Sequence, residues 1–422
     1  MKKYTPYILI VLYFFTFTIG QVLGAWDRSG PQFLFLSAIN IISFVYLFNS
    51  KSISFLINQI KENKYVLCYT LFVLVSGLSI IVADNKIEAL IVFSELLTFF
   101  FVFISLYTIS LDLKKKFVDF IIALTFISLI IEIYPSLSLF YENAFLDSNA
   151  FFRSNDYKGF SGNINISAFS IIYKVPLLFY LIFKYKSYYL NLLFSLILFF
   201  STTVLIILLS RGAVLALIFS IILLVLFSLY SKKRVYLLKS IFISFVCISS
   251  YMSTTNYIQS LNGENIFNDR MQTLNKGQED ESIAQRSRYF KASLQSIINY
   301  PILGVGIGNW KIESIKYDAY KMTEYYVPFY VHNDFLQIGA EIGIIGLLFF
   351  VLFIIGSLLE VFKKIIKNDD LLISIFLFIS LSNYVIDAMI NFPTFRPISH
   401  IYLLFLVCMI YTSMKKKLNE IS

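Results

Sequence analysis

Charged residues are scarce in this chain, and so are the residue types that build metal sites or disulfide frameworks. Asp, Glu, Lys and Arg make up 14% of the 422 residues, whereas hydrophobic residues make up 58%. A soluble domain has about a quarter charged residues, so this chain cannot hide its apolar excess in one core. Its three cysteines are scattered through apolar runs, and histidine occurs twice. We therefore expect neither a zinc site nor a disulfide framework.

Long apolar runs predict an all-α, polytopic membrane protein. A helix that crosses a bilayer needs about 20 apolar residues, and this rule gives about twelve spans. The stretch 188–230 is about twice that length, and only Ser210-Arg211-Gly212 interrupts it, so we expect the chain to reverse there. The first run is interpreted as a retained helix, because no small-x-small cleavage site follows it. The predicted spans are 6–23, 31–48, 65–83, 89–109, 117–134, 165–183, 188–209, 212–230, 236–253, 335–362, 370–390 and 398–414.

Lysine and arginine are concentrated in alternate short segments between these spans. With both termini in the cytoplasm, the basic segments are cytoplasmic, as the positive-inside rule requires. The formal charge of +9 therefore reflects the basic residues of the cytoplasmic segments, and no nucleic-acid partner is expected. The expected organisation is nine spans in 1–253 with a medium outer loop over 135–164, one large outer loop over 254–334, and three spans in 335–422.

The large loop contains a predicted amphipathic helix from Ile283 to Asn299. Its apolar residues recur at helical spacing, Arg288 lies on a different face, and Pro301 follows its end. The glycine-rich stretch 304–308 comes next. No strand precedes it, so a tight turn close to the bilayer is expected rather than a nucleotide-binding loop. The tyrosines that follow indicate either an interfacial belt or a sugar-stacking surface; they are Tyr317, Tyr320, Tyr325, Tyr326 and Tyr330.

Lys174 is the deepest ionisable residue in the predicted spans, where such residues are costly and suggest function. It either contacts substrate in a cavity open to the outside or pairs with Glu95 or Glu132 to hold helices together. Asp334 and Gln337 match a capping box, which predicts Asp334 as the cap of the tenth span.

His332 lies at the N-terminus of the same predicted helix, where the helix dipole disfavours imidazolium. A neutral imidazole facing a cavity suits a general base, although an ordinary interfacial histidine fits the position too. The other histidine, His400, is expected to be a packing or interface residue. Arg211 and Arg288 are the best anion-binding candidates, because guanidinium binds phosphate bidentately; the alternative is contact with lipid headgroups.

Several of these motifs together resemble the O-antigen ligase and O-antigen polymerase superfamily. The resemblance covers most of the chain in architecture, with its motifs concentrated in about 160–212 and 286–346. The matching residues are Gly162-Asn163-Ile164-Asn165, Ser210-Arg211-Gly212, Arg288-Tyr289-Phe290, Tyr300-Pro301, Gly304-Val305-Gly306-Ile307-Gly308-Asn309-Trp310, His332-Asn333-Asp334-Phe335-Leu336-Gln337 and Glu341-Ile342-Gly343-Ile344-Ile345-Gly346.

The resemblance implies a GT-C type membrane glycosyltransferase that needs no metal or cofactor. Its donor would be a glycan on undecaprenyl pyrophosphate. His332 would deprotonate or orient the acceptor hydroxyl, with Arg288 as the second catalytic residue, and the anomeric carbon would invert. The substrate-binding residues implied for the pyrophosphate and glycan are Arg211, Arg288, Asn163, Asn165, Asn333 and Lys174.

The acceptor expected is lipid A–core, which would make the protein an O-antigen ligase at the outer face of the bacterial inner membrane. A polymerase that extends lipid-linked repeats and an enzyme that glycosylates proteins stay open. From other classes, a twelve-span transporter or lipid-glycan flippase predicts an internal repeat that we do not find, and a non-catalytic scaffold predicts a replaceable His332. The roles of Arg153, Lys158 and Arg396 stay open as well.

Overall fold

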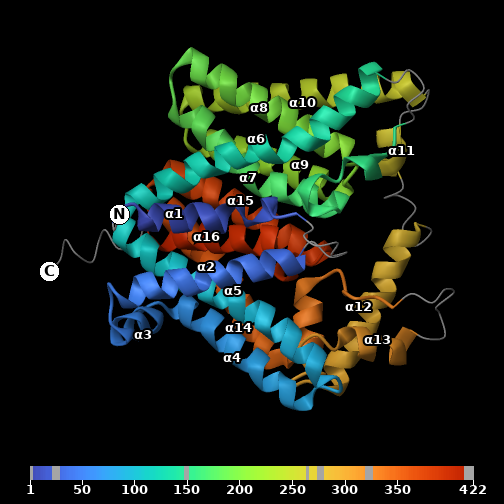
Figure 1. Cartoon of the computed structure of the whole chain (residues 1–422). Helices are drawn as coiled ribbons and strands as arrows, with labels where there is room; N and C mark the ends of the chain where they lie inside the picture. Colours follow the sequence, from blue (N-terminus) through green and yellow to red (C-terminus); the bar gives the residue numbers. More distant parts are fainter. Residues whose placement is uncertain are drawn as a thin grey trace. The chain divides into compact units, whose positions relative to one another are not determined.

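A computed structural model describes residues 3–20, 29–146, 152–262, 266–272, 280–318 and 327–412, and this part of the chain contains helices and turns but no strand. The predicted all-α class is confirmed (Figure 1). Ten of the described helices are long and apolar enough to span a membrane. The first and last predicted spans are the shorter apolar helices Thr5–Thr18 and Pro397–Thr412, so the count of twelve spans stays a prediction.

Most of the α-helices coincide with a predicted span. In chain order they are α1 (Thr5–Phe14), α2 (Ser29–Phe48), α3 (Ile53–Glu62), α4 (Lys64–Ser79), α5 (Lys86–Leu113), α6 (Lys115–Leu146), α7 (Ile164–Lys184), α8 (Tyr188–Ile207), α9 (Arg211–Tyr230), α10 (Arg234–Asn262), α11 (Ile266–Gln272), α12 (Glu281–Asn299), α13 (Trp310–Asp318), α14 (Asp334–Ile366), α15 (Leu371–Ile390) and α16 (Pro397–Thr412).

The first of two compact units comprises Met1–Lys114, Lys276–Glu360 and Asp387–Ser422. In it, α5 packs against α2 and α16. His400 of α16 is fully buried, its Nε2 lies 2.8 Å from the Tyr69 hydroxyl, and its ring centroid lies 4.6 Å from that of Phe99. His400 therefore packs inside this helix bundle, which was one of the two positions expected for it.

The second unit comprises Lys115–Asn275 and Val361–Ile386. Its centre is α7, which is buried without interruption from Ala168 to Phe183 and packs against α6, α8 and α9. The Asn383 amide donates to the carbonyl of Ile172 at 3.1 Å. The predicted reversal at residues 210–212 is confirmed, since α8 ends at Ile207 and α9 begins at Arg211.

Two predicted span ends differ most from the structure. The fifth predicted span ends at residue 134, but α6 continues through Pro135 to Leu146. A proline removes one backbone hydrogen bond and is tolerated in membrane helices when neighbouring groups compensate. The ninth predicted span ends at residue 253, but α10 continues to Asn262. The helices therefore extend into both predicted outer loops, because hydropathy marks the apolar part of a helix and not its end.

The predicted amphipathic helix of the large loop is confirmed as α12. Asp280 caps it, because its carboxylate accepts from the amide of Ile283 at 3.1 Å. Tyr289 on this helix joins a buried cluster with Trp310 of α13, Val331 and Ala340 of α14. The helices α12 and α13 lie against one another (Figure 1).

The glycine stretch forms the predicted tight turn, and it docks on α14. Gly304, Gly306 and Gly308 all have positive φ, which glycine adopts without steric cost. The Val305 amide donates to the carbonyl of Ala340 at 3.0 Å, and the amide of Ile344 donates to the carbonyl of Pro301 at 2.8 Å. The carbonyl and amide groups of a helix are available for such bonds only where the hydrogen bonds within the helix are interrupted.

That break lies at Gly343, whose φ of 78° interrupts the helical geometry of α14. Just before it, the buried carboxylate of Glu341 accepts from the amide of Gly308 at 3.0 Å and from the amide of Trp310 at 3.3 Å. The buried charge is thereby hydrogen-bonded, as burial requires. Glu341 and Gly343 together attach the loop turn to α14.

Gly343→Ala should destabilise the protein, because a Cβ there would overlap the carbonyl of Ile302 and the residue has positive φ. Strained backbone alone costs about 1–3 kcal/mol, so the midpoint of thermal unfolding in detergent should fall. The matched control is Gly30→Ala in α2, where a Cβ meets no atom within 4 Å. Equal midpoints for the two variants would contradict the docking role of Gly343.

Candidate functional site

The N-terminus of α14 is capped by Asn333 and not by Asp334, which corrects the prediction. The Asn333 Oδ1 accepts from the amide of Leu336 at 3.0 Å, and its Nδ2 donates to the carbonyl of Met389 at 3.0 Å. The Asp334 carboxylate instead accepts from the amide and hydroxyl of Thr394, at 2.9 and 2.6 Å. Because the Asp334 carboxylate is hydrogen-bonded to the turn that precedes α16, the residue before it caps the helix.

His332 lies directly before this cap in a strained conformation. Its φ of 60° places it in the left-handed region, which is uncommon for a residue other than glycine and is found at functional sites. Its ring is parallel to that of Tyr289, with centroids 6.5 Å apart, and meets Phe392 edge-on at 5.1 Å. The Nδ1 atom is buried and has no hydrogen-bond partner among the described residues.

The surroundings keep the imidazole neutral. Burial, with a smaller contribution from the charges of Arg286 and Arg396, lowers the pKa of His332 to about 4. At neutral pH the ring therefore carries one proton and has one nitrogen able to accept a second. A neutral, half-buried imidazole is the form that a general base needs.

Arg396 lies over two stacked rings beside His332. The rings of Tyr330 and Phe392 are nearly parallel, with their centroids 4.1 Å apart. The guanidinium carbon of Arg396 lies 4.8 Å from the ring centroid of Phe392. The Nε atom of Arg396 is buried without a hydrogen-bond partner in the described part of the chain. The sequence left this arginine without a role, because only folding brings the segment after α15 to His332.

Arg288 lies half-buried on α12, one residue before the Tyr289 that stacks on His332. The first unit thus contains three of the predicted site residues: His332 and Asn333, which are adjacent in the chain, and Arg288, whose neighbour Tyr289 stacks on His332. Sequence reasoning missed Tyr289 and Phe392 as ring partners of His332, since nothing local marks an aromatic residue as one. Among the predicted tyrosines, Tyr320, Tyr325 and Tyr326 lie outside the described residues.

The second unit contains the other predicted residues. Asn163 caps α7, accepting from the amides of Asn165 and Ile166 at 2.9 and 3.2 Å. The Asn165 Oδ1 accepts from the hydroxyl of Ser210 at 2.9 Å, so the start of α7 lies beside the start of α9 and its Arg211. Two motifs that are 45 residues apart in the chain therefore meet.

Lys174 lies further along α7 and is paired with Glu132 of α6. It also donates to the hydroxyl of Ser170 at 2.9 Å, and that hydroxyl donates to Glu132 at 2.7 Å. Both charged side chains are at most 5% exposed. Of the two pairings that the sequence left open, the structure contains the one with Glu132, and a buried pair of this kind satisfies two charges that would otherwise be costly.

The described residues contain no group of three or more His, Cys, Asp or Glu side chains that could hold a metal ion. The charged groups that act on His332 are instead those of Arg286 and Arg396. Such donors suit an anionic ligand with oxygen acceptors.

A comparison with protein families supports the resemblance stated above. Residues 196–351 match the model of the family described as Wzy_C, O-antigen ligase. The matched segment contains the reversal at 210–212, α12 with Arg288, the glycine turn and His332. No curated protein matches the chain. The match supports a membrane glycosyl-transfer function in O-antigen processing for an integral membrane protein.

His332 should titrate near pH 4 instead of near 6.5 when its ¹⁵N resonances are followed in histidine-labelled protein in detergent. Arg396→Gln should raise this pKa, because it removes a nearby positive charge, but should leave it below 6.5, because burial is the larger cause. The control Lys291→Gln changes an exposed cation on α12 and should leave the pKa unchanged. A wild-type pKa near 6.5 would rule out the neutral, desolvated imidazole.

Proposed function

We propose that this protein transfers a glycan from undecaprenyl pyrophosphate to a hydroxyl of lipid A–core, as an O-antigen ligase at the periplasmic face of the bacterial inner membrane. One observation carries the proposal: a strained, neutral His332 lies between aromatic rings and beside arginines, in a segment that matches the O-antigen ligase family. The cytoplasmic position of both termini belongs to the same proposal and rests on the distribution of lysine and arginine.

In the proposed reaction the acceptor oxygen attacks the anomeric carbon on the side opposite the pyrophosphate. The new carbon–oxygen bond forms while the bond to the pyrophosphate oxygen breaks, and the electron pair leaves with the phosphate. The hydroxyl proton passes to His332, and the anomeric configuration inverts. Pyrophosphate is a good leaving group once its growing charge is offset, so the scheme includes no metal or cofactor.

The donor itself would improve His332 as a base. With a pKa of about 4 the free side chain is a weak base. A bound pyrophosphate brings negative charge close to the imidazole, and negative charge favours the protonated form and raises the pKa. Proton transfer would thereby become more favourable when the donor is in place.

Arginines would stabilise the leaving pyrophosphate. Arg288 and Arg211 are assigned to this role by their motifs, because guanidinium forms paired hydrogen bonds with phosphate oxygens. Asn163, Asn165 and Asn333 would help to place the glycan. Asn163 and Asn333 cap α7 and α14, and Asn333 also donates to the carbonyl of Met389, so these residues would act by holding the two helix starts in place. Lys174 would likewise act indirectly, through its pair with Glu132.

His332→Ala and Arg288→Ala should each lower glycan transfer by about a hundredfold or more, because a general base contributes about 10²–10⁴ in rate and a group that stabilises the charge of the leaving group contributes about 10²–10³. The measurement compares surface glycolipids on a gel from a deletion strain that carries each variant. Lys291→Ala, an exposed cation on the same helix, is the control and should keep the wild-type pattern.

The products distinguish the possible acceptors. Loss of all core-attached glycan, with long polymer accumulating on the lipid carrier, supports a ligase. Retention of single repeats on the core with loss of the ladder would indicate a polymerase, and loss of glycan from proteins would indicate protein glycosylation. Normal transfer by both alanine variants at normal protein level would refute the catalytic assignment.

A further inference from the structure

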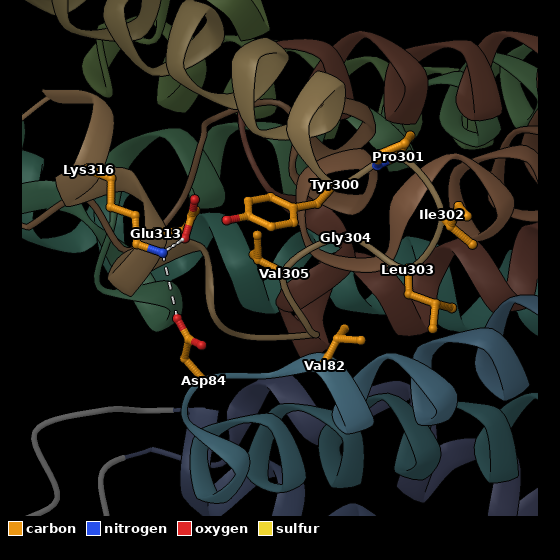
Figure 2. A pocket seen from close by; sticks show the side chains of 10 residues that line it. All are labelled: Val82, Asp84, Tyr300, Pro301, Ile302, Leu303, Gly304, Val305, Glu313 and Lys316. Carbon is orange, nitrogen blue, oxygen red and sulfur yellow. Dashed lines mark hydrogen bonds and ion pairs between the residues drawn. The ribbon is translucent and has the colours of Figure 1, made fainter.

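A cavity of about 510 Å³ lies in the first unit, apart from His332. It forms where the turn after α12 meets the connection between α4 and α5 and the start of α13 (Figure 2). Its wall includes Gly304 and Val305, which are held in place by the bond from the Val305 amide to Ala340 of α14. The glycine turn therefore builds this cavity as well as joining the loop to α14.

One end of the cavity is apolar and open. Val82, at the end of the candidate span Lys64–Val82, lies opposite Ile302 and Leu303 of the turn (Figure 2). Val82 is 45% exposed and Ile302 is 64% exposed. An apolar opening at the end of a membrane helix is a place where a lipid chain can enter without leaving its apolar surroundings.

The other end of the cavity is polar and carries more negative than positive charge. The Lys316 ammonium lies 2.6 Å from a carboxylate oxygen of Glu313 and 3.7 Å from one of Asp84 (Figure 2). Glu313 is 3% exposed, and Tyr300 adds a ring and a hydroxyl. Two carboxylates against one ammonium repel a phosphate but accept hydrogen bonds from hydroxyl groups.

The charge of this cavity is opposite to that of the surroundings of His332. Arg286 and Arg396 lie close enough to His332 to lower its pKa, whereas the cavity has Asp84 and Glu313. The two places therefore suit different ligands, an anionic one near His332 and an uncharged, hydroxyl-rich one in the cavity. Aromatic rings such as that of Tyr300 pack against the apolar faces of such ligands.

We propose that this cavity binds an uncharged glycolipid, with sugar hydroxyls at Asp84, Glu313 and Tyr300 and a lipid chain over Val82 and Ile302. This site is separate from the transfer reaction at His332, and the inference does not rest on the proposed function, because it follows from the shape and charge of the cavity.

The probe is an alkyl maltoside that carries a photoreactive diazirine in its chain, added to the full-length protein in lipid nanodiscs. Crosslinks should map to the peptide that contains residues 300–305. Ile302→Trp fills the apolar end and should reduce the crosslink about tenfold. Ile298→Trp on α12 is the matched control, because Ile298 is 76% exposed and does not line the cavity, and it should crosslink like the wild type.

Competition with unlabelled ligands tests which part of the probe, the sugar or the alkyl chain, is responsible for binding. Unlabelled alkyl maltoside should compete, whereas an alkyl phosphate of the same chain length and free maltose should each compete about tenfold less. Equal competition by the alkyl phosphate would overturn the preference for an uncharged headgroup, and an unchanged crosslink in Ile302→Trp would overturn the site.

The variant His332→Ala tests the glycolipid site independently of the proposed function. It should keep the crosslink, because His332 does not line the cavity. Loss of transfer with retained crosslinking supports both proposals. Retained transfer together with crosslinking that Ile302→Trp removes would refute the catalytic assignment and leave the glycolipid site standing.

Discussion

The arrangement of the first unit depends on a buried carboxylate that needs hydrogen-bond donors. Glu341 is 1% exposed, and the donors it receives are the amides of Gly308 and Trp310, together with the side chain of Gln337 at 3.3 Å. An unpaired carboxylate at this position would be costly, so α14 and the loop turn have to fold against each other. Gly343 makes the contact possible, because its open geometry lets the chain around Ile302 approach the helix backbone.

His332 is positioned as a consequence of this attachment. The turn determines where α12 ends, and α12 supplies the Tyr289 ring that stacks on His332. On the other side, the bonds from Thr394 to Asp334 hold the segment that carries Phe392. Rigid neighbours on both sides are what a residue with unfavourable φ requires, because strain persists only where the surrounding structure enforces it.

Much of the fold follows from local patterns in the sequence. Apolar length predicted the helices, the single interruption by Ser210-Arg211-Gly212 predicted the reversal between α8 and α9, and helical spacing predicted α12 between Ile283 and Asn299. Proline and glycine after α12 predicted the tight turn. These features are readable because hydrophobic length, helical periodicity and permissive backbone conformations depend on neighbouring residues alone.

Only the tertiary structure determined which polar groups are paired with one another. Asp334 looks like a helix cap in sequence, but Thr394, 60 residues further on, takes its carboxylate and leaves the cap to Asn333. Lys174 had Glu95 and Glu132 as possible partners, and the packing of α6 on α7 selects Glu132. The sequence by itself determined which segments are helices, where they turn and which residues resemble the motifs of the O-antigen ligase superfamily. Folding determined which polar groups meet, because a buried charge takes the partner that packing brings to it, whatever their separation along the chain.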